Sequence, residues 1–316
     1  MNRRQFFLLI TICFTLLPSC SKGRYEVFSG YAQGGTYTVK ANLKGVKVSH
    51  AQIASKIDSL LTGIDFSISG YNKNSILSRR NRGEDAAPDS IFTALVRLSE
   101  LYSGQTDGAF SVTAAPLYDL WGFGFKSGEF PDEGQIAEAL ARSKEGKIFN
   151  FNAIAQGYSC DLIASYLYSI GVKDMLVDIG EIYCDGLNPS GKGWAIGVDE
   201  PIDGNDTPGA KLNSVWRSDG GPCGIVTSGN YRKFYIREGK KYAHTIDPKS
   251  GRPVEHNLLS ATIVAPTAAQ ADAYATACMV MGPEKAREFI ESHDDIEGLL
   301  ICADSSWASE GFNIER

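Results

Sequence analysis

The spacing of apolar side chains along the chain alternates between two patterns, one helical and one strand-like. In Ser49–Ile64, apolar residues such as Ile53, Ile57 and Leu60 recur every three or four positions, and this spacing predicts an amphipathic helix. The same reasoning predicts further helices at Asp89–Tyr102, Pro131–Arg142, Ala153–Ile170, Ala268–Met281 and Pro283–Ser292.

Apolar and polar residues alternate in several other segments, and this alternation predicts strands. Near the N-terminus, Tyr25–Tyr31 and Thr36–Ala41 alternate on either side of a Gln33-Gly34-Gly35 turn. A strand-rich stretch is predicted at Met175–Ile179, Trp194–Val198, Val215–Ser218, Gly224–Thr227, Tyr231–Arg237, Lys241–His244 and Leu259–Ala265, with a final hairpin from about Gly298 to Asn313.

The order of these elements predicts the fold class. Helices and strands are mixed without regular alternation, which favours an α+β fold with a mainly antiparallel sheet and packed helices over a doubly wound fold. No internal repeat and no long polar linker divides the sequence. We therefore expect a single domain over residues 25–316.

The first residues carry a different pattern. Two arginines precede an apolar run from Phe6 to Leu17, which indicates a secretory signal and is too short to span a membrane. Leu17-Pro18-Ser19-Cys20 is similar to a bacterial lipoprotein box, in which the cysteine receives fatty acyl chains such as palmitate. We expect a signal peptide at 1–19, lipidation of Cys20 and a tether at 20–24; the alternative is a plain secretory signal.

Composition and charge narrow the classes of function. The chain has 316 residues, 43% of them hydrophobic, which excludes a disordered protein. The formal net charge of -6 argues against nucleic acid as a partner, because nucleic-acid binders usually present a basic face. Five cysteines follow Cys20 at wide spacing and without a Cys-x-x-Cys pair, so we expect buried thiols rather than a zinc site or a disulfide framework.

One segment resembles a phosphate-binding P-loop but fails its requirements. Gly186–Gly193 ends in Gly-Lys-Gly, whereas a P-loop needs a Ser or Thr hydroxyl at the last position. A P-loop also opens a helix, and the residues after Gly193 read as a strand. We interpret this segment as a hairpin turn.

The predicted helix Ala268–Met281 carries a pair of oxygen-bearing side chains. Asp272 and Thr276 are four residues apart, so they share one face of the helix. A carboxylate and a hydroxyl suit Mg²⁺, which takes its other ligands from water and phosphate oxygens. The alternative is a polar pair within a tightly packed helix of small residues.

Two further segments contain candidate chemistry. His244 ends a predicted strand just before the turn at Asp247-Pro248, and a histidine there could act as general base or serve only the fold. Asn150–Tyr158 lies where a strand leads into a helix, and such a helix start favours phosphate.

Seven short motifs occur in one order along the chain. They are Gly35-Thr36, Ser69–Tyr71, Gly108–Phe110, Asn152–Tyr158, Thr227–Tyr231, His244–Gly251 and Asp272–Thr276. In this order and spacing they resemble the ApbE family, the FAD:protein FMN transferases, over roughly residues 25–312. The resemblance implies a T-fold-like α+β domain, usually lipid-anchored and extracytoplasmic; we expect the periplasmic side of a bacterial inner membrane.

The resemblance also implies a ligand site. Mg²⁺ would be held by the Asp272 carboxylate, the Thr276 hydroxyl and the Ala153 carbonyl, and would bridge the pyrophosphate of FAD. The family's flavin-nucleotide contacts fall on Gly34, Tyr71, Ala109, Phe110, Ser111, Asn150 and Gln156. Three of these depart from common family residues: many members have Met at the position of Gly34, Asp at Asn150 and Lys at Gln156.

The implied reaction is transfer of FMN from FAD to a threonine hydroxyl of an acceptor protein, with AMP released. His244 is the candidate base, and Asp247 is the second choice or orients the histidine. Family acceptors are typically subunits of membrane redox complexes, which suits an anchored enzyme. Two alternatives stay open: an FAD pyrophosphatase that releases FMN and AMP, and a non-catalytic FAD-binding lipoprotein.

Overall fold

A computed structural model describes residues 23–124, 130–205, 207–231, 234–237 and 239–315. The predicted signal peptide, the lipidation site at Cys20 and the first part of the tether lie outside these residues. Within the described part of the chain, no helix combines the length and the apolar character needed to cross a membrane.

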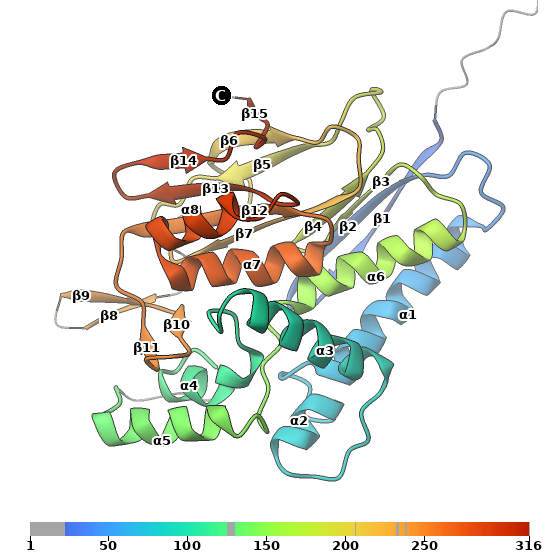
Figure 1. The fold of residues 1–316 in the computed structure, drawn as a ribbon. Coiled ribbons are helices and arrows are strands. Elements are labelled where there is room, and N and C mark those ends of the chain that lie inside the picture. The colour runs from blue at the N-terminus through green and yellow to red at the C-terminus, as the bar shows by residue number, and fades with distance from the viewer. Residues whose placement is uncertain (1–22, 125–129, 206, 232–233, 238, 316) are drawn as a thin grey trace, which may run out of the picture.

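The centre of the fold is an eight-stranded sheet in the order β1-β2-β3-β4-β7-β12-β13-β14 (Figure 1). Each neighbouring pair runs antiparallel. The strands are β1 (Tyr25–Ala32), β2 (Gly35–Asn42), β3 (Met175–Asp178), β4 (Ile182–Asp185), β7 (Cys223–Gly229), β12 (Leu258–Ala265), β13 (Glu297–Cys302) and β14 (Ser306–Ala308).

Helices cover one face of this sheet (Figure 1). They are α1 (His50–Ile68), α6 (Ala155–Ser169), α7 (Ala268–Met281) and α8 (Pro283–Glu291), and α3 (Ser90–Gln105) packs against α1 and α7. The first turn of α7 lies directly on the sheet at Gly224, where a Cβ would come within 2.3 Å of the Ala268 Cα. Glycine at this position therefore permits the close approach of helix and strand.

A second, smaller sheet covers the opposite face. It consists of β15 (Ile314–Glu315), β6 (Leu212–Arg217) and β5 (Ala195–Asp199), in that order. Trp194 and Trp216 pack there against Ile225 of the large sheet, whereas the next residue, Val226, belongs to the core on the helix side. Burial of both faces explains why the central strands are apolar over nearly their whole length.

Most of the remaining elements form a lobe beside the helices, whereas α2 lies apart from it, next to α1 and α3 (Figure 1). Leu117, Trp121, Ile136 and Ile246 make the core of the lobe, and the Trp121 indole N–H donates to the Gly251 carbonyl over 2.8 Å. The elements outside the two sheets and the covering helices are α2 (Ile76–Asn81), η1 (Val112–Ala114), α4 (Ala115–Leu120), α5 (Glu133–Lys144), β8 (Phe234–Arg237), β9 (Lys240–Ala243), β10 (Ile246–Asp247) and β11 (Arg252–Pro253).

The predicted α+β class with a mainly antiparallel sheet is confirmed, and one predicted strand is corrected. Tyr231 lies in a bend and is buried, and the described strand β8 spans Phe234–Arg237. Ile314 pairs with Trp216 of β6, so the chain after the final hairpin joins the small sheet. The short strand β4 was not predicted, because it spans only four residues.

The structure agrees with the rejection of a P-loop, because the Gly186–Gly193 segment leads into strand β5 and not into a helix. The interpretation of this segment as a hairpin turn is wrong: it is a loop that connects the two sheets, since β4 belongs to the large sheet and β5 to the small one. The five described cysteines are free thiols. Cys184 and Cys223 are cross-strand neighbours with their sulfur atoms 3.7 Å apart, a proximity that their spacing in the sequence does not reveal.

Candidate active site

A cavity of about 330 Å³ lies where the helices, the end of the central strand β7 and the lobe meet. Its lining comes from segments far apart in the sequence: the turn after α1, the loop before η1, the N-terminal end of α6, the end of β7, the residues after β9 and one face of α7. Eight of the residues predicted from the sequence line it: Tyr71, Phe110, Ser111, Asn150, Ala153, His244, Asp272 and Thr276.

Four other predicted residues do not belong to this lining. Gly34 lies at the β1–β2 turn with φ 84°, and Ala109 is buried in the helix-side core. The Gln156 amide donates to the Ile179 carbonyl over 2.8 Å. The Asp247 carboxylate accepts hydrogen bonds from the backbone N–H groups that follow it in the turn. Asp247 therefore stabilises the turn after His244, and we do not place it at the cavity.

Close contact between α6 and α7 positions the Asp272 carboxylate. Gly157 of α6 faces the first turn of α7, and a Cβ on Gly157 would lie 2.3 Å from the Ala268 carbonyl oxygen. Without a side chain, its backbone N–H reaches the Asp272 Oδ2 at 3.1 Å. Gly157 lies in the first turn of α6, where backbone N–H groups have no carbonyl partner within the helix, and the Asp272 carboxylate supplies that partner. Among the described residues, no backbone N–H donates to the Ala153 carbonyl, which leaves its oxygen free for a ligand.

Burial governs the electrostatics around Asp272. Its side chain is 5% exposed, and burial raises the pKa of its carboxyl well above the usual value, with the Asp161 carboxylate adding to the rise. Burial also raises the pKa of Asp161 to about 6, although its carboxylate accepts the backbone N–H groups of Ala268 and Ala269. A desolvated carboxylate of this kind is stabilised by a cation at its free oxygen.

The oxygen atoms around Asp272 form a set that fits magnesium. Thr276 lies one turn further along α7, and its hydroxyl is 3.4 Å from the Ser228 hydroxyl of β7. Carboxylate, hydroxyl and carbonyl oxygens are ligands that Mg²⁺ accepts, while its remaining positions go to water and phosphate. In the described part of the chain, no group of three His, Cys, Asp or Glu side chains is arranged to hold a metal ion. The donor set therefore fits a hard cation better than zinc.

His244 approaches the cavity from another element. It follows the last residue of β9, and its ring lies 6.4 Å from that of Phe123 at an interplanar angle of 67°. An imidazole at a cavity wall can accept a proton from a bound hydroxyl group.

Sequence reasoning gave no role to several residues of the lining. Glu181, which follows Gly180, adds a second carboxylate to the lining. Ser228 belongs to the Thr227–Tyr231 motif, but the sequence alone assigned it no role. Among the described residues that line the cavity, none is Lys or Arg. The lining residues without an individual prediction are Tyr118, Phe123, Asn152, Glu181, Thr227, Ser228, Gly229, Tyr231, Thr245 and Met279.

Comparison with known proteins identifies relatives of this chain. The family model described as "ApbE family" matches residues 34–300. The FAD:protein FMN transferase of Escherichia coli K12 is 32% identical over 288 residues, which cover 83% of this chain and 79% of the relative. That of Vibrio cholerae is 30% identical and covers 97% of each chain.

Solved structures give the same result. The Vibrio cholerae flavin transferase ApbE has a TM-score of 0.76 and 29% identity, covering 92% of this chain and 98% of that one. The apo form of the Pseudomonas stutzeri flavinyl transferase ApbE has a TM-score of 0.77 and 30% identity, covering 91% and 95%.

Proposed function

The chain belongs to the ApbE family, and we propose that it transfers FMN from FAD to a threonine hydroxyl of an acceptor protein in a magnesium-dependent reaction. The family identification made from the sequence is confirmed, and so is the enzyme class, that of a flavin transferase. The metal, the acceptor residue and the assignment of individual side chains are the proposed part.

The observation that carries the proposal is the oxygen set at Asp272, Thr276 and Ala153. FAD brings a pyrophosphate with negative charge, yet no Lys or Arg belongs to the described lining of the cavity. The buried Asp272 carboxylate adds to that negative charge. A divalent cation between them would neutralise both, which is the function of such ions in phosphoryl transfer.

Other side chains of the cavity would bind the nucleotide and transfer the proton. Tyr71 is 73% exposed at the cavity mouth, and it offers an aromatic face for a flavin or adenine ring. We assign His244 as the base that takes the proton from the acceptor hydroxyl. The acceptor oxygen forms a bond to the phosphorus of the FMN part, the bond from that phosphorus to the AMP oxygen breaks, and AMP leaves. The product carries FMN in phosphoester linkage.

We also propose that the protein is anchored to a membrane through Cys20, on the extracytoplasmic side. The lipoprotein-like segment around Cys20 supports this, as does the short tether before β1. A subunit of a membrane redox complex would then lie within reach as acceptor. Expression of Cys20→Ala should move the protein from the membrane fraction to the soluble fraction; retention in the membrane would contradict the anchor.

The test of the proposed reaction uses the chain from residue 21, FAD, Mg²⁺ and a candidate acceptor domain. Covalent flavin fluorescence on the acceptor after denaturing electrophoresis, lost when EDTA is added and when the acceptor threonine is replaced by valine, would support the proposal. Release of free FMN and AMP without labelling would instead indicate a pyrophosphatase. Unchanged FAD would indicate a binding protein.

A further inference from the structure

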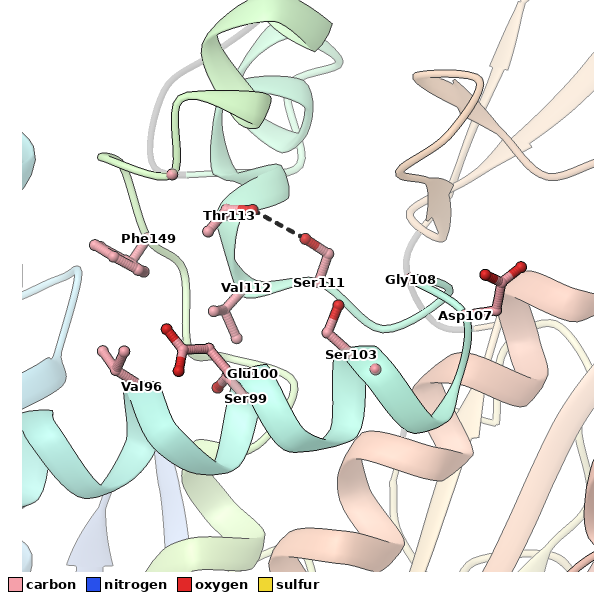
Figure 2. A pocket seen from close by; sticks show the side chains of 12 residues that line it. Val96, Ser99, Glu100, Ser103, Asp107, Gly108, Ser111, Val112, Thr113 and Phe149 are labelled. Carbon is pink, nitrogen blue, oxygen red and sulfur yellow. Dashed lines mark hydrogen bonds between the residues drawn. The ribbon is translucent and has the colours of Figure 1, made fainter.

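A second pocket, of about 480 Å³, lies between α3 and the loop that precedes η1 (Figure 2). Val96, Ser99, Glu100, Ser103 and Gly104 contribute the α3 side. Their spacing of three and four residues places them on one face of the helix. We call this pocket the α3 groove. Its volume is in the range of pockets that hold small ligands or short peptide segments.

The floor of the α3 groove contains a polar atom without a partner. Ser99 is 3% exposed, and its buried hydroxyl oxygen has no hydrogen-bond partner among the described residues. Further hydroxyls line the groove: Ser103 rises from α3 toward the facing loop, where the Ser111 and Thr113 hydroxyls are 3.1 Å apart (Figure 2). A buried hydroxyl without a partner is costly, so a bound polar group would stabilise it.

The α3 groove adjoins the active-site cavity. Ser111 lines both the groove and the catalytic cavity. A second point of contact is the strand-like segment before α6, where Phe149 lines the groove and its neighbour Asn150 lines the cavity. A chain lying in the groove can therefore place one of its residues at the cavity.

The negative charge of the α3 groove indicates which kind of ligand it can bind. Its charged lining residues in the described chain are both carboxylates, Glu100 and Asp107. Asp107 pairs with the Lys249 ammonium over 2.5 Å, whereas no described residue pairs with Glu100. This excess of negative charge disfavours an anionic occupant such as a nucleotide phosphate and favours a neutral or cationic one.

We propose that the α3 groove binds the stretch of the acceptor protein next to its flavinylated threonine, as an extended segment with a nearby Lys or Arg that pairs with Glu100. This inference rests on the proposed function, because it requires a polypeptide acceptor. Backbone N–H groups of the segment donate to the hydroxyls of Ser99 and Ser103, and the threonine passes Ser111 into the catalytic cavity.

The decisive variant is Gly104→Phe. A Cβ at Gly104 meets no atom within 4 Å, so the ring fills the groove without disturbing the helix. The matched control is Arg97→Phe, an exposed position on α3 outside the groove lining. We expect Gly104→Phe to raise the KM for the acceptor about tenfold or more, with the Kd for FAD and the unfolding temperature unchanged. Arg97→Phe should behave as wild type.

A second variant keeps the proposal testable if Gly104→Phe folds poorly. Glu100→Lys reverses the charge at an exposed position, and it should raise the acceptor KM more than Glu100→Gln does, with FAD binding unaffected. Wild-type acceptor kinetics in both Gly104→Phe and Glu100→Lys would overturn the proposal. Weaker FAD binding in Gly104→Phe would also overturn it, by assigning the groove to the nucleotide. If neither the wild type nor Arg97→Phe labels the acceptor with flavin, the proposed function itself would be refuted.

Discussion

The backbone N–H of Gly157 donates to the Asp272 carboxylate across the α6–α7 contact, at 3.1 Å. This bond fixes one oxygen of a buried carboxylate, and it gives a partner to a first-turn N–H of α6 that the helix itself leaves without one. The bond joins the start of α6, which closely follows Ala153, to Asp272, so it links two segments that carry proposed metal ligands and lie more than a hundred residues apart in the sequence.

Replacement of Asp272 by asparagine should separate catalysis from folding. Burial raises the pKa of Asp272, so the ionised form costs stability in metal-free protein above that pKa. Asp272→Asn should therefore unfold at the same or a higher temperature than wild type without metal. It should lose the rise in unfolding temperature caused by Mg²⁺, and its flavinylation rate should fall about 10²-fold or more. An undiminished Mg²⁺ effect in calorimetry would show that the metal binds elsewhere.

Replacement of Gly157 by alanine should damage both packing and site. The added Cβ would clash with the Ala268 carbonyl oxygen, and backbone on both sides leaves little room to relax. We expect a loss of about 1–3 kcal/mol in the free energy of unfolding, measured with urea, and weaker Mg²⁺ binding. Gly104→Ala is the matched control: its Cβ enters open space on α3, so it should stabilise the protein by about 0.5–1 kcal/mol. Equal stability of the two variants would contradict the described α6–α7 contact.

Removal of the His244 imidazole should affect the chemical step. As general base, His244 would contribute a factor of about 10²–10⁴ to the rate of transfer. His244→Ala should therefore slow single-turnover flavinylation by that factor, while the Kd for FAD, followed by flavin fluorescence, changes far less. Parallel losses in rate and in FAD affinity would assign His244 to binding.

The stability of the fold should depend on the protonation of His256. Its Nε2 lies 2.8 Å from the Met279 carbonyl, and the Leu258 N–H donates to its Nδ1 over 3.3 Å, so the ring is neutral in the fold. Burial lowers its pKa below the ordinary 6.5. The unfolded chain then takes up a proton at higher pH than the folded one, and the contribution of His256 to stability is lost as pH falls below about 6.5.

His256→Gln removes this titration. Its free energy of unfolding, measured from pH 8 to pH 5, should fall less steeply than that of wild type. The lower slope would come with a lower stability at pH 8, because the bridge between the end of α7 and the start of β12 is altered. Identical slopes would mean that His256 does not titrate between the two states.

Local sequence was enough to predict most elements and one half of the proposed metal site. The period of apolar residues predicts α1 and α3 because one face of each helix must be buried, whereas α7 consists mostly of small residues and is buried nearly all round. Asp272 and Thr276 were paired by helical geometry alone, since residues four apart share a face. Short elements such as α2 and β4 were not predicted, because a few residues are too short a stretch to show a period of apolar side chains.

Other features depend on contacts that local patterns do not encode. The α6–α7 approach pairs Gly157 with Asp272, sheet register pairs Cys184 with Cys223, and the turn around Asp247 withdraws that carboxylate from the cavity. In the sequence, Ser99 is one polar residue among several in a predicted helix. Only the structure shows that its hydroxyl is buried and lines the α3 groove.

The sequence by itself determined the fold class, the family and the residue types available for chemistry, because these follow from local periodicity and from motifs kept in order. Only the tertiary structure decided which oxygen atoms converge, which carboxylate is desolvated and which groove adjoins the cavity. The physical reason is that burial, hydrogen-bond partners and pKa are properties of neighbours in space, and those neighbours come from segments that the chain brings together only on folding.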